Sequence, residues 1–193
     1  MGAESLTHWL TPPPGGFTVD DFLSMRDLPR HTELIDGSLV FVSPQQIWHV
    51  RIIDLIREEL KRQAPPEWRV EREMSVRLAK HEMPEPDLIV VTAEAYANQA
   101  RTSTYYTADD LVLAVEAVSP ESVSRDRLVK PLKYAAAGIE HFWRVEQDGD
   151  RTVVYVYVRD PATAEYALTG IFHEHMKLTV PFEIDLDLTR VMG

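Results

Sequence analysis

The chain has 193 residues, of which 45% are hydrophobic and 26% charged, values that are ordinary for a globular domain and exclude wholesale disorder. Its net charge of −11 argues against a constitutive, non-specific coat on nucleic acid, although it leaves room for a local basic groove. The absence of cysteine excludes disulfides, cysteine nucleophiles and thiolate metal sites.

The run from Pro12 to Gly16 predicts a flexible lead-in over residues 1–16, followed by a single domain over 17–193. The first residues lack the basic region and apolar core of a secretion signal. No apolar run is long enough to span a bilayer. We therefore expect a cytoplasmic protein without a membrane partner.

The first part of the domain has clear local signals. Thr18 is expected to cap a short helix. Asp36-Gly37 between two apolar runs predicts a hairpin over residues 33–42. A helical period follows over residues 45–61, and alternation over 68–78 indicates one or two half-buried strands.

The later elements are predicted from apolar runs and their breakers. Strands are expected over residues 88–91, 111–115, 142–145, 153–158 and 166–171, with a mostly extended tail over 178–188. The polar stretch 93–110 is expected to be a loop, with room for one helical turn. Residues 124–137 are expected to be helical, and Pro131 requires that this helix either starts late, near residue 129, or kinks there. The strand–helix–strand order over 111–145 predicts a mixed sheet flanked by helices.

Two carboxylates in apolar surroundings are the strongest chemical signal. Asp87 opens one strand and Glu116 ends another. If these strands are neighbours, two charges about 4 Å apart repel by ~4 kcal/mol at an effective dielectric constant of 20. A bound Mg²⁺ or Mn²⁺ ion would remove that penalty, and oxygen ligands favour these ions over zinc. Alternatively, each carboxylate pairs separately with a nearby arginine.

Positive charge follows on the next helix. Arg125, Arg127, Lys130 and Lys133 outnumber Asp126 there, which suits contact with phosphate. Lys130 could reach back over the strand ends to orient water or neutralise a phosphate in the transition state. The alternative is a solvated helix lysine.

Three more residues are weighed between two roles. Glu33, in the hairpin, is either a further ligand of metal or water or an edge-strand charge. His49 either binds phosphate or a carboxylate, or is a structural histidine. Tyr134, four residues after Lys130, either belongs to the substrate-binding set or packs against the lysine stem.

These residues occur in an ordered pattern. Glu33 to Gly37 is followed by Ser43-Pro44 and His49, then by Pro86-Asp87, Glu116 to Pro120, the set Asp126, Lys130 and Tyr134, Gly138-Ile139, and Phe142-Trp143. This pattern resembles the Uma-two family of restriction-endonuclease domains, part of the PD-(D/E)XK nuclease superfamily, over roughly residues 17–187. The strand lysine of that signature is missing, and Lys130 resembles the migrated lysine of some branches. Phe142 stands where Tyr is usual, and Glu146 where Asp is usual.

The resemblance implies a restriction-endonuclease-like α/β core: a central mixed sheet flanked by helices, with an N-terminal hairpin and extra C-terminal strands. It implies a metal-dependent DNA endonuclease that forms a homodimer. Asp87, Glu116 and the Ala117 carbonyl would hold Mg²⁺ or Mn²⁺, Lys130 would assist the attacking water, and Glu33 would be an accessory acidic residue. The expected substrate contacts are His49, Arg125, Arg127, Lys133 and Tyr134.

Two other functions stay open on the sequence. The net charge and the missing strand lysine would also fit an inactive nuclease-like fold that binds nucleic acid or protein. A glycoside hydrolase would use Glu33 and Glu116 as an acid–base pair, but that function explains neither Lys130 nor the basic segment around it.

Overall fold

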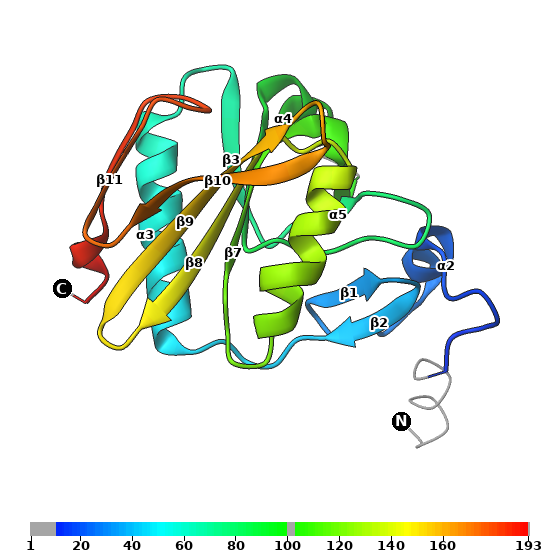
Figure 1. The fold of residues 1–193 in the computed structure, drawn as a ribbon. Coiled ribbons are helices and arrows are strands. Elements are labelled where there is room, and N and C mark those ends of the chain that lie inside the picture. Colours follow the sequence, from blue (N-terminus) through cyan, green and yellow to red (C-terminus); the bar gives the residue numbers. More distant parts are fainter. Residues whose placement is uncertain (1–10, 100–102, 193) are drawn as a thin grey trace.

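A mixed six-stranded sheet forms the centre of the computed structural model, which describes residues 11–99 and 103–192 (Figure 1). Its strand order is β10-β9-β8-β7-β5-β3. The strands are β3 (Trp68–Arg72), β5 (Leu88–Thr92), β7 (Leu111–Ala117), β8 (His141–Asp148), β9 (Arg151–Asp160) and β10 (Glu165–Phe172). The neighbours β7 and β8 are parallel and the other pairs are antiparallel, which confirms the predicted mixed sheet.

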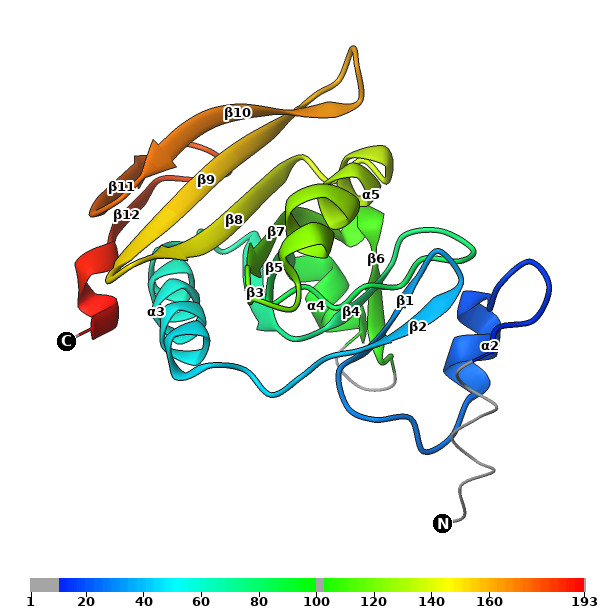
Figure 2. The same ribbon diagram turned by 60° about the horizontal axis from the view of Figure 1, so that its bottom comes forward.

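Each face of the sheet is covered by a different set of elements (Figure 2). Helix α3 (Ile47–Gln63), the strand pair β11 (His175–Leu178) and β12 (Ile184–Asp187), and the turn η3 (Leu188–Met192) share one apolar core with the sheet. Helices α4 (Ala93–Gln99) and α5 (Lys130–Ala136) cover the opposite face. The odd and even positions of β5 divide between these two cores, because successive strand side chains point to opposite faces.

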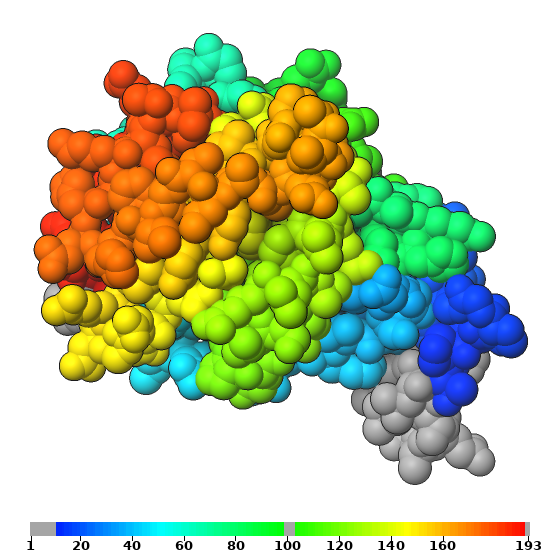
Figure 3. Space-filling model, viewed as in Figure 1, coloured from blue at the N-terminus to red at the C-terminus, as the bar shows by residue number. Residues whose placement is uncertain are grey.

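The N-terminal elements lie beside this sheet. Thr18 caps α2 (Val19–Ser24) as predicted, in a reciprocal capping box with Asp21. The predicted hairpin is confirmed as β1 (Thr32–Ile35) and β2 (Ser38–Phe41). Figure 3 shows the hairpin surface next to that of α5.

The expected loop over 93–110 is wrong for most of its length. Residues 93–99 form α4, β6 (Tyr105–Thr107) pairs in parallel with β4 (Ser75–Arg77), and a 3₁₀ turn, η1 (Ala108–Asp110), follows. Thr92 caps α4 by accepting a hydrogen bond from the Ala95 amide, and Ala95 is buried against the sheet. This tertiary contact stabilises a helix whose own hydrophobic periodicity is weak.

Pro131 is accommodated by a π turn, η2 (Arg125–Val129), which leads directly into α5. The amide of Lys130 donates to the carbonyl of Arg125, five residues earlier. The helix therefore begins before residue 129, and its widened turn precedes the proline that cannot donate a hydrogen bond.

Residues 1–10 of the predicted lead-in lie outside the described residues. At its end, the Gly16 amide donates to the Pro13 carbonyl, and the Phe17 amide donates to the Gly37 carbonyl. Within residues 11–99 and 103–192, no helix combines the length and apolar character needed to cross a membrane.

The close approach of the hairpin turn to the lead-in predicts a specific effect of Gly37→Ala. Gly37 has φ +70°, and a Cβ there would lie 2.9 Å from the Gly16 Cα. We expect the free energy of unfolding, measured in urea, to fall by about 2–4 kcal/mol, because alanine is strained in the left-handed conformation and its Cβ would displace the neighbouring backbone. The control is Gly149→Ala. Gly149 has φ +58°, but an added Cβ would have no atom within 4 Å, so the free energy of unfolding should fall by only about 1–2 kcal/mol. Equal losses would contradict the packing argument.

Candidate active site

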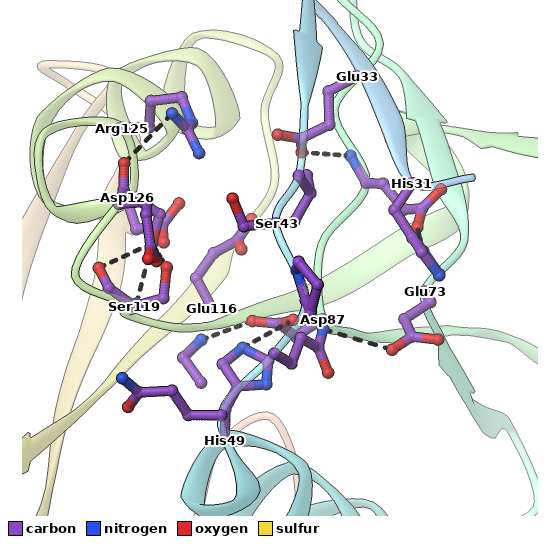
Figure 4. Close-up of a pocket in the computed structure, with 18 of the residues that line it drawn as sticks. His31, Glu33, Ser43, His49, Glu73, Asp87, Glu116, Ser119, Arg125 and Asp126 are labelled. Carbon is purple, nitrogen blue, oxygen red and sulfur yellow. Dashed lines mark hydrogen bonds and ion pairs between the residues drawn. The ribbon is translucent and has the colours of Figure 1, made fainter. Parts of the chain in front are cut away.

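A pocket of about 110 Å³ lies at the end of the sheet where β5 begins and β7 ends (Figure 4). It is closed by the hairpin, the start of α3 and the segment leading into α5. Two permanent cations, Arg125 and Lys130, line it together with seven carboxylates: Glu33, Glu73, Glu85, Asp87, Glu116, Glu121 and Asp126. Negative charge is therefore in excess.

The two carboxylates singled out from the sequence come from neighbouring strands. The antiparallel register places Leu88 opposite Val115, so Asp87 lies beside Glu116 at the end of the sheet. The Ala117 amide donates to Asp87 Oδ2 over 2.7 Å. Among the described residues, neither carboxylate has the separate arginine partner of the alternative interpretation: His49 contacts Asp87, and Lys130 contacts Glu116.

The Lys130 ammonium is buried between three carboxylates. Its Nζ lies 2.8 Å from Glu33 Oε1, 3.0 Å from Glu116 Oε1 and 3.5 Å from Asp126 Oδ1. Burial by itself would lower the pKa of Lys130. The surrounding carboxylates have a larger, opposite effect, so the net pKa lies well above its usual value. Lys130 is thus a fixed positive charge in the pocket wall, not a solvated helix lysine.

Glu116 is hydrogen-bonded by Tyr134 from the side of the core. The buried phenol donates to Glu116 Oε1 over 2.5 Å, while Lys130 also donates to Oε2 over 3.1 Å. Burial raises the pKa of Glu116 well above its usual value, and the charge of Lys130 opposes this rise. Tyr134 therefore orients the carboxylate from within the core.

His49 lies in the first turn of α3 and is buried. Its Nε2 is 3.2 Å from Asp87 Oδ1. Burial lowers the pKa of His49, but the hydrogen bond and charge of Asp87 outweigh this, so that the net pKa is raised. The contact gives Asp87 a second fixed donor besides the Ala117 amide.

The expected substrate contacts divide between the pocket and other surfaces. His49 and Arg125 line the pocket. Arg127 pairs with Glu146 outside it, Lys133 contacts Asp36 and Glu82 at 2.6 Å, and Tyr134 is fully buried. The local excess of positive charge therefore does not gather at one place.

Arg125 differs from its neighbours because no carboxylate in the described part of the chain lies within 4.0 Å of its guanidinium group. Its Nη1 donates to the Glu121 carbonyl over 3.4 Å, and its side chain is half-buried at the pocket wall. Arg125 is the cation of the pocket that is available to an anionic group of a ligand.

Several pocket residues receive no functional role in the sequence analysis. Asp126 has one usable signal, its spacing of four residues before Lys130. His31 and Glu73 have positive φ values of 59° and 52°, conformations that the sequence does not reveal. His31 contacts Glu85 over 2.6 Å at the opposite side of the pocket from Arg125 (Figure 4).

The donors of the pocket suit a hard divalent cation in chemical type, because they are carboxylates in excess over positive charge. Within the described residues, no three histidine or acidic side chains already stand close enough together to enclose a metal ion. An ion that binds Asp87 and Glu116 would share Glu116 with Lys130 and Tyr134.

The enclosure of Lys130 predicts a large loss of stability in Lys130→Met. Removing the ammonium leaves three buried carboxylates without their counter-charge, and we expect urea unfolding to show a loss of about 3–5 kcal/mol. Lys177→Met is the control, since Lys177 and its partner Asp185 are 71% and 52% exposed. The control should lose about 1 kcal/mol or less. Similar losses in both variants would show that the Lys130 contacts are not specially important.

Comparison with known proteins places the chain in a family. No curated protein matches the chain. A crystal structure described as that of a "putative nuclease belonging to DUF820" from Anabaena variabilis is similar, with a TM-score of 0.67 and 17% identity over 92% of this chain and 99% of the other. A family model described as "Putative restriction endonuclease", Uma2, matches residues 19–190. The chain belongs to the Uma2 family, which confirms the resemblance noted in its sequence.

Proposed function

We propose that the protein is a DNA endonuclease that hydrolyses phosphodiester bonds with Mg²⁺ or Mn²⁺. The observation that carries the proposal is the meeting of Asp87, Glu116 and Lys130 at one pocket, in a chain of the Uma2 family. The excess of carboxylates would repel a phosphodiester, so the pocket needs a further cation before it can accept one.

Asp87 and Glu116, with the carbonyl of Ala117, are the proposed metal ligands. A divalent ion held there would supply Lewis-acid polarisation of a phosphoryl oxygen and favour ionisation of water. His49 and the Ala117 amide hold Asp87 in place, and Tyr134 holds Glu116. The chain thus fixes the orientation of both carboxylates through hydrogen bonds to their oxygens.

Lys130 and Arg125 have different proposed tasks. Lys130, enclosed by carboxylates, provides a fixed charge that offsets negative charge as it develops on the phosphate. Arg125, without a carboxylate partner among the described residues, binds a non-reacting phosphate oxygen and positions the DNA. Glu33 is an accessory residue that holds Lys130. The homodimer and the cytoplasmic location implied earlier stay predictions.

One observation favours a second function, binding of nucleic acid without cleavage. Both oxygens of Glu116 already accept hydrogen bonds from Lys130 or Tyr134, so this side chain has hydrogen-bond partners without a metal. Titration calorimetry with Mg²⁺ separates the two functions. A nuclease should bind the ion in an Asp87-dependent manner, whereas an inactive module should not.

The main test is plasmid cleavage by Asp87→Asn. Loss of a ligand charge should reduce cleavage in Mg²⁺ or Mn²⁺ by about 10²- to 10³-fold, and a chelator should abolish cleavage by the unmodified protein. Asp54→Asn is the control, because Asp54 pairs with Arg72 and does not line the pocket. Equal cleavage by all three proteins would indicate a contaminating nuclease and contradict the proposal.

Arg125→Gln tests the proposed phosphate contact. Loss of one charge-assisted hydrogen bond of about 1.5–2 kcal/mol should lower kcat/KM for DNA roughly 10- to 30-fold, mainly through KM. The matched control is Arg127→Gln, two residues away, whose side chain is paired with Glu146. The assignment is wrong if steady-state kinetics show the same KM for Arg125→Gln as for the unmodified protein.

A further inference from the structure

Lys130 is surrounded by more carboxylates than its single positive charge can neutralise. Glu33, Glu116 and Asp126 surround a single ammonium, and each of the four side chains is at most 5% exposed. Tyr134 adds a neutral donor but no charge. When all three acids are ionised, the buried cluster has two negative charges that nothing within it offsets. A purely structural ion pair would need only one of the acids.

Asp126 is the acid of this cluster that lies farthest from the Lys130 ammonium. Its Oδ1 is 3.5 Å from Lys130 Nζ, compared with 2.8 Å for Glu33 and 3.0 Å for Glu116. That oxygen is buried and accepts no hydrogen bond within the described residues. Burial raises the pKa of Asp126, while Lys130 opposes the rise. An ionised carboxylate in this position lowers the stability of the fold.

The local backbone brings Asp126 to this place. It lies in the π turn before Pro131, four residues before Lys130, so that both side chains face the pocket from one side of the helix. Widened turns of this kind are frequent at functional sites. Glu33 and Glu116 already bind Lys130 without Asp126. The third acid is therefore not needed to neutralise the ammonium.

We propose that Asp126 is a positioning residue for Lys130 and that its charge is kept at the expense of stability. This inference rests on the proposed function, in which the ammonium offsets charge on the phosphate. A lysine side chain is long and flexible, and attraction from two sides alone would draw its Nζ toward Glu33 and Glu116. Attraction from Asp126 on a third side holds the ammonium at the pocket wall, where a phosphate can approach it.

The geometry defines which kinetic step Asp126 affects. Its unpartnered oxygen is enclosed, so it does not touch a substrate in this arrangement. Its influence passes through Lys130 to the charge that develops during reaction, and not through binding of the DNA. A change at Asp126 should therefore lower kcat and leave KM nearly unchanged.

Asp126→Asn tests this inference because it keeps the shape of the side chain and removes its charge. We expect the midpoint of urea unfolding to rise, kcat for plasmid cleavage to fall roughly 10- to 100-fold, and KM to change less than about twofold. Asp126→Glu, which restores the charge, should recover part of kcat and lose the gain in stability. A structural ion pair predicts the opposite stability effect, a fall in the unfolding midpoint of Asp126→Asn.

Glu146→Gln is the matched control outside the pocket. Glu146 is the shared acceptor of Arg127 and Arg144, so its neutralisation should lower the unfolding midpoint without changing kcat. A lower midpoint or an unchanged kcat in Asp126→Asn would overturn the inference while the nuclease proposal stands. Failure of the unmodified protein to cleave DNA would instead overturn the proposed function, and the positioning role with it.

Discussion

The contact between the Lys130 ammonium and its carboxylates joins three parts of the chain at one point. Glu33 comes from the hairpin, Glu116 from a central strand, and Lys130 itself from the helix that covers the sheet. Glu33 also accepts a hydrogen bond from the Glu85 amide, so the hairpin is fixed to the segment before β5 as well as to α5. The position of the pocket wall therefore depends on a polar contact between elements that are far apart in the sequence.

In the proposed function, the negative charge of the pocket would attract a cation first, and the bound cation would then allow a phosphate to approach. Two carboxylates about 4 Å apart repel each other by ~4 kcal/mol at an effective dielectric constant of 20. Lys130 offsets part of this repulsion, but Asp87 lies at the same end of the sheet, and its ion-pair partner among the described residues is His49. A divalent ion would relieve the remaining repulsion and reverse the sign of the potential that a phosphate meets.

Local patterns predict the elements of this fold better than they predict which elements meet. The hairpin at Asp36-Gly37 and the apolar strand before Glu116 follow from turn chemistry and strand periodicity. The pairing of β5 with β7, which brings Asp87 to Glu116, depends on the tertiary fold. From the sequence alone, this pairing could only be assumed. Helix α4 was missed because its stability depends on a capping Thr92 and a buried face, both set by the sheet.

Which way the basic side chains of this helix point could be predicted only once one residue was known to face the buried cluster. Asp126, Lys130 and Tyr134 recur at four-residue spacing and all face the buried cluster. Because each residue of a helical turn is rotated by roughly a quarter turn from the one before it, Arg125 and Arg127 flank that stripe on opposite sides. The pocket occupies one side and Glu146 the other, so one arginine is left for a ligand while the other is neutralised. A local sum of charges cannot distinguish these two environments, whereas helical geometry combined with the position of Glu116 does so.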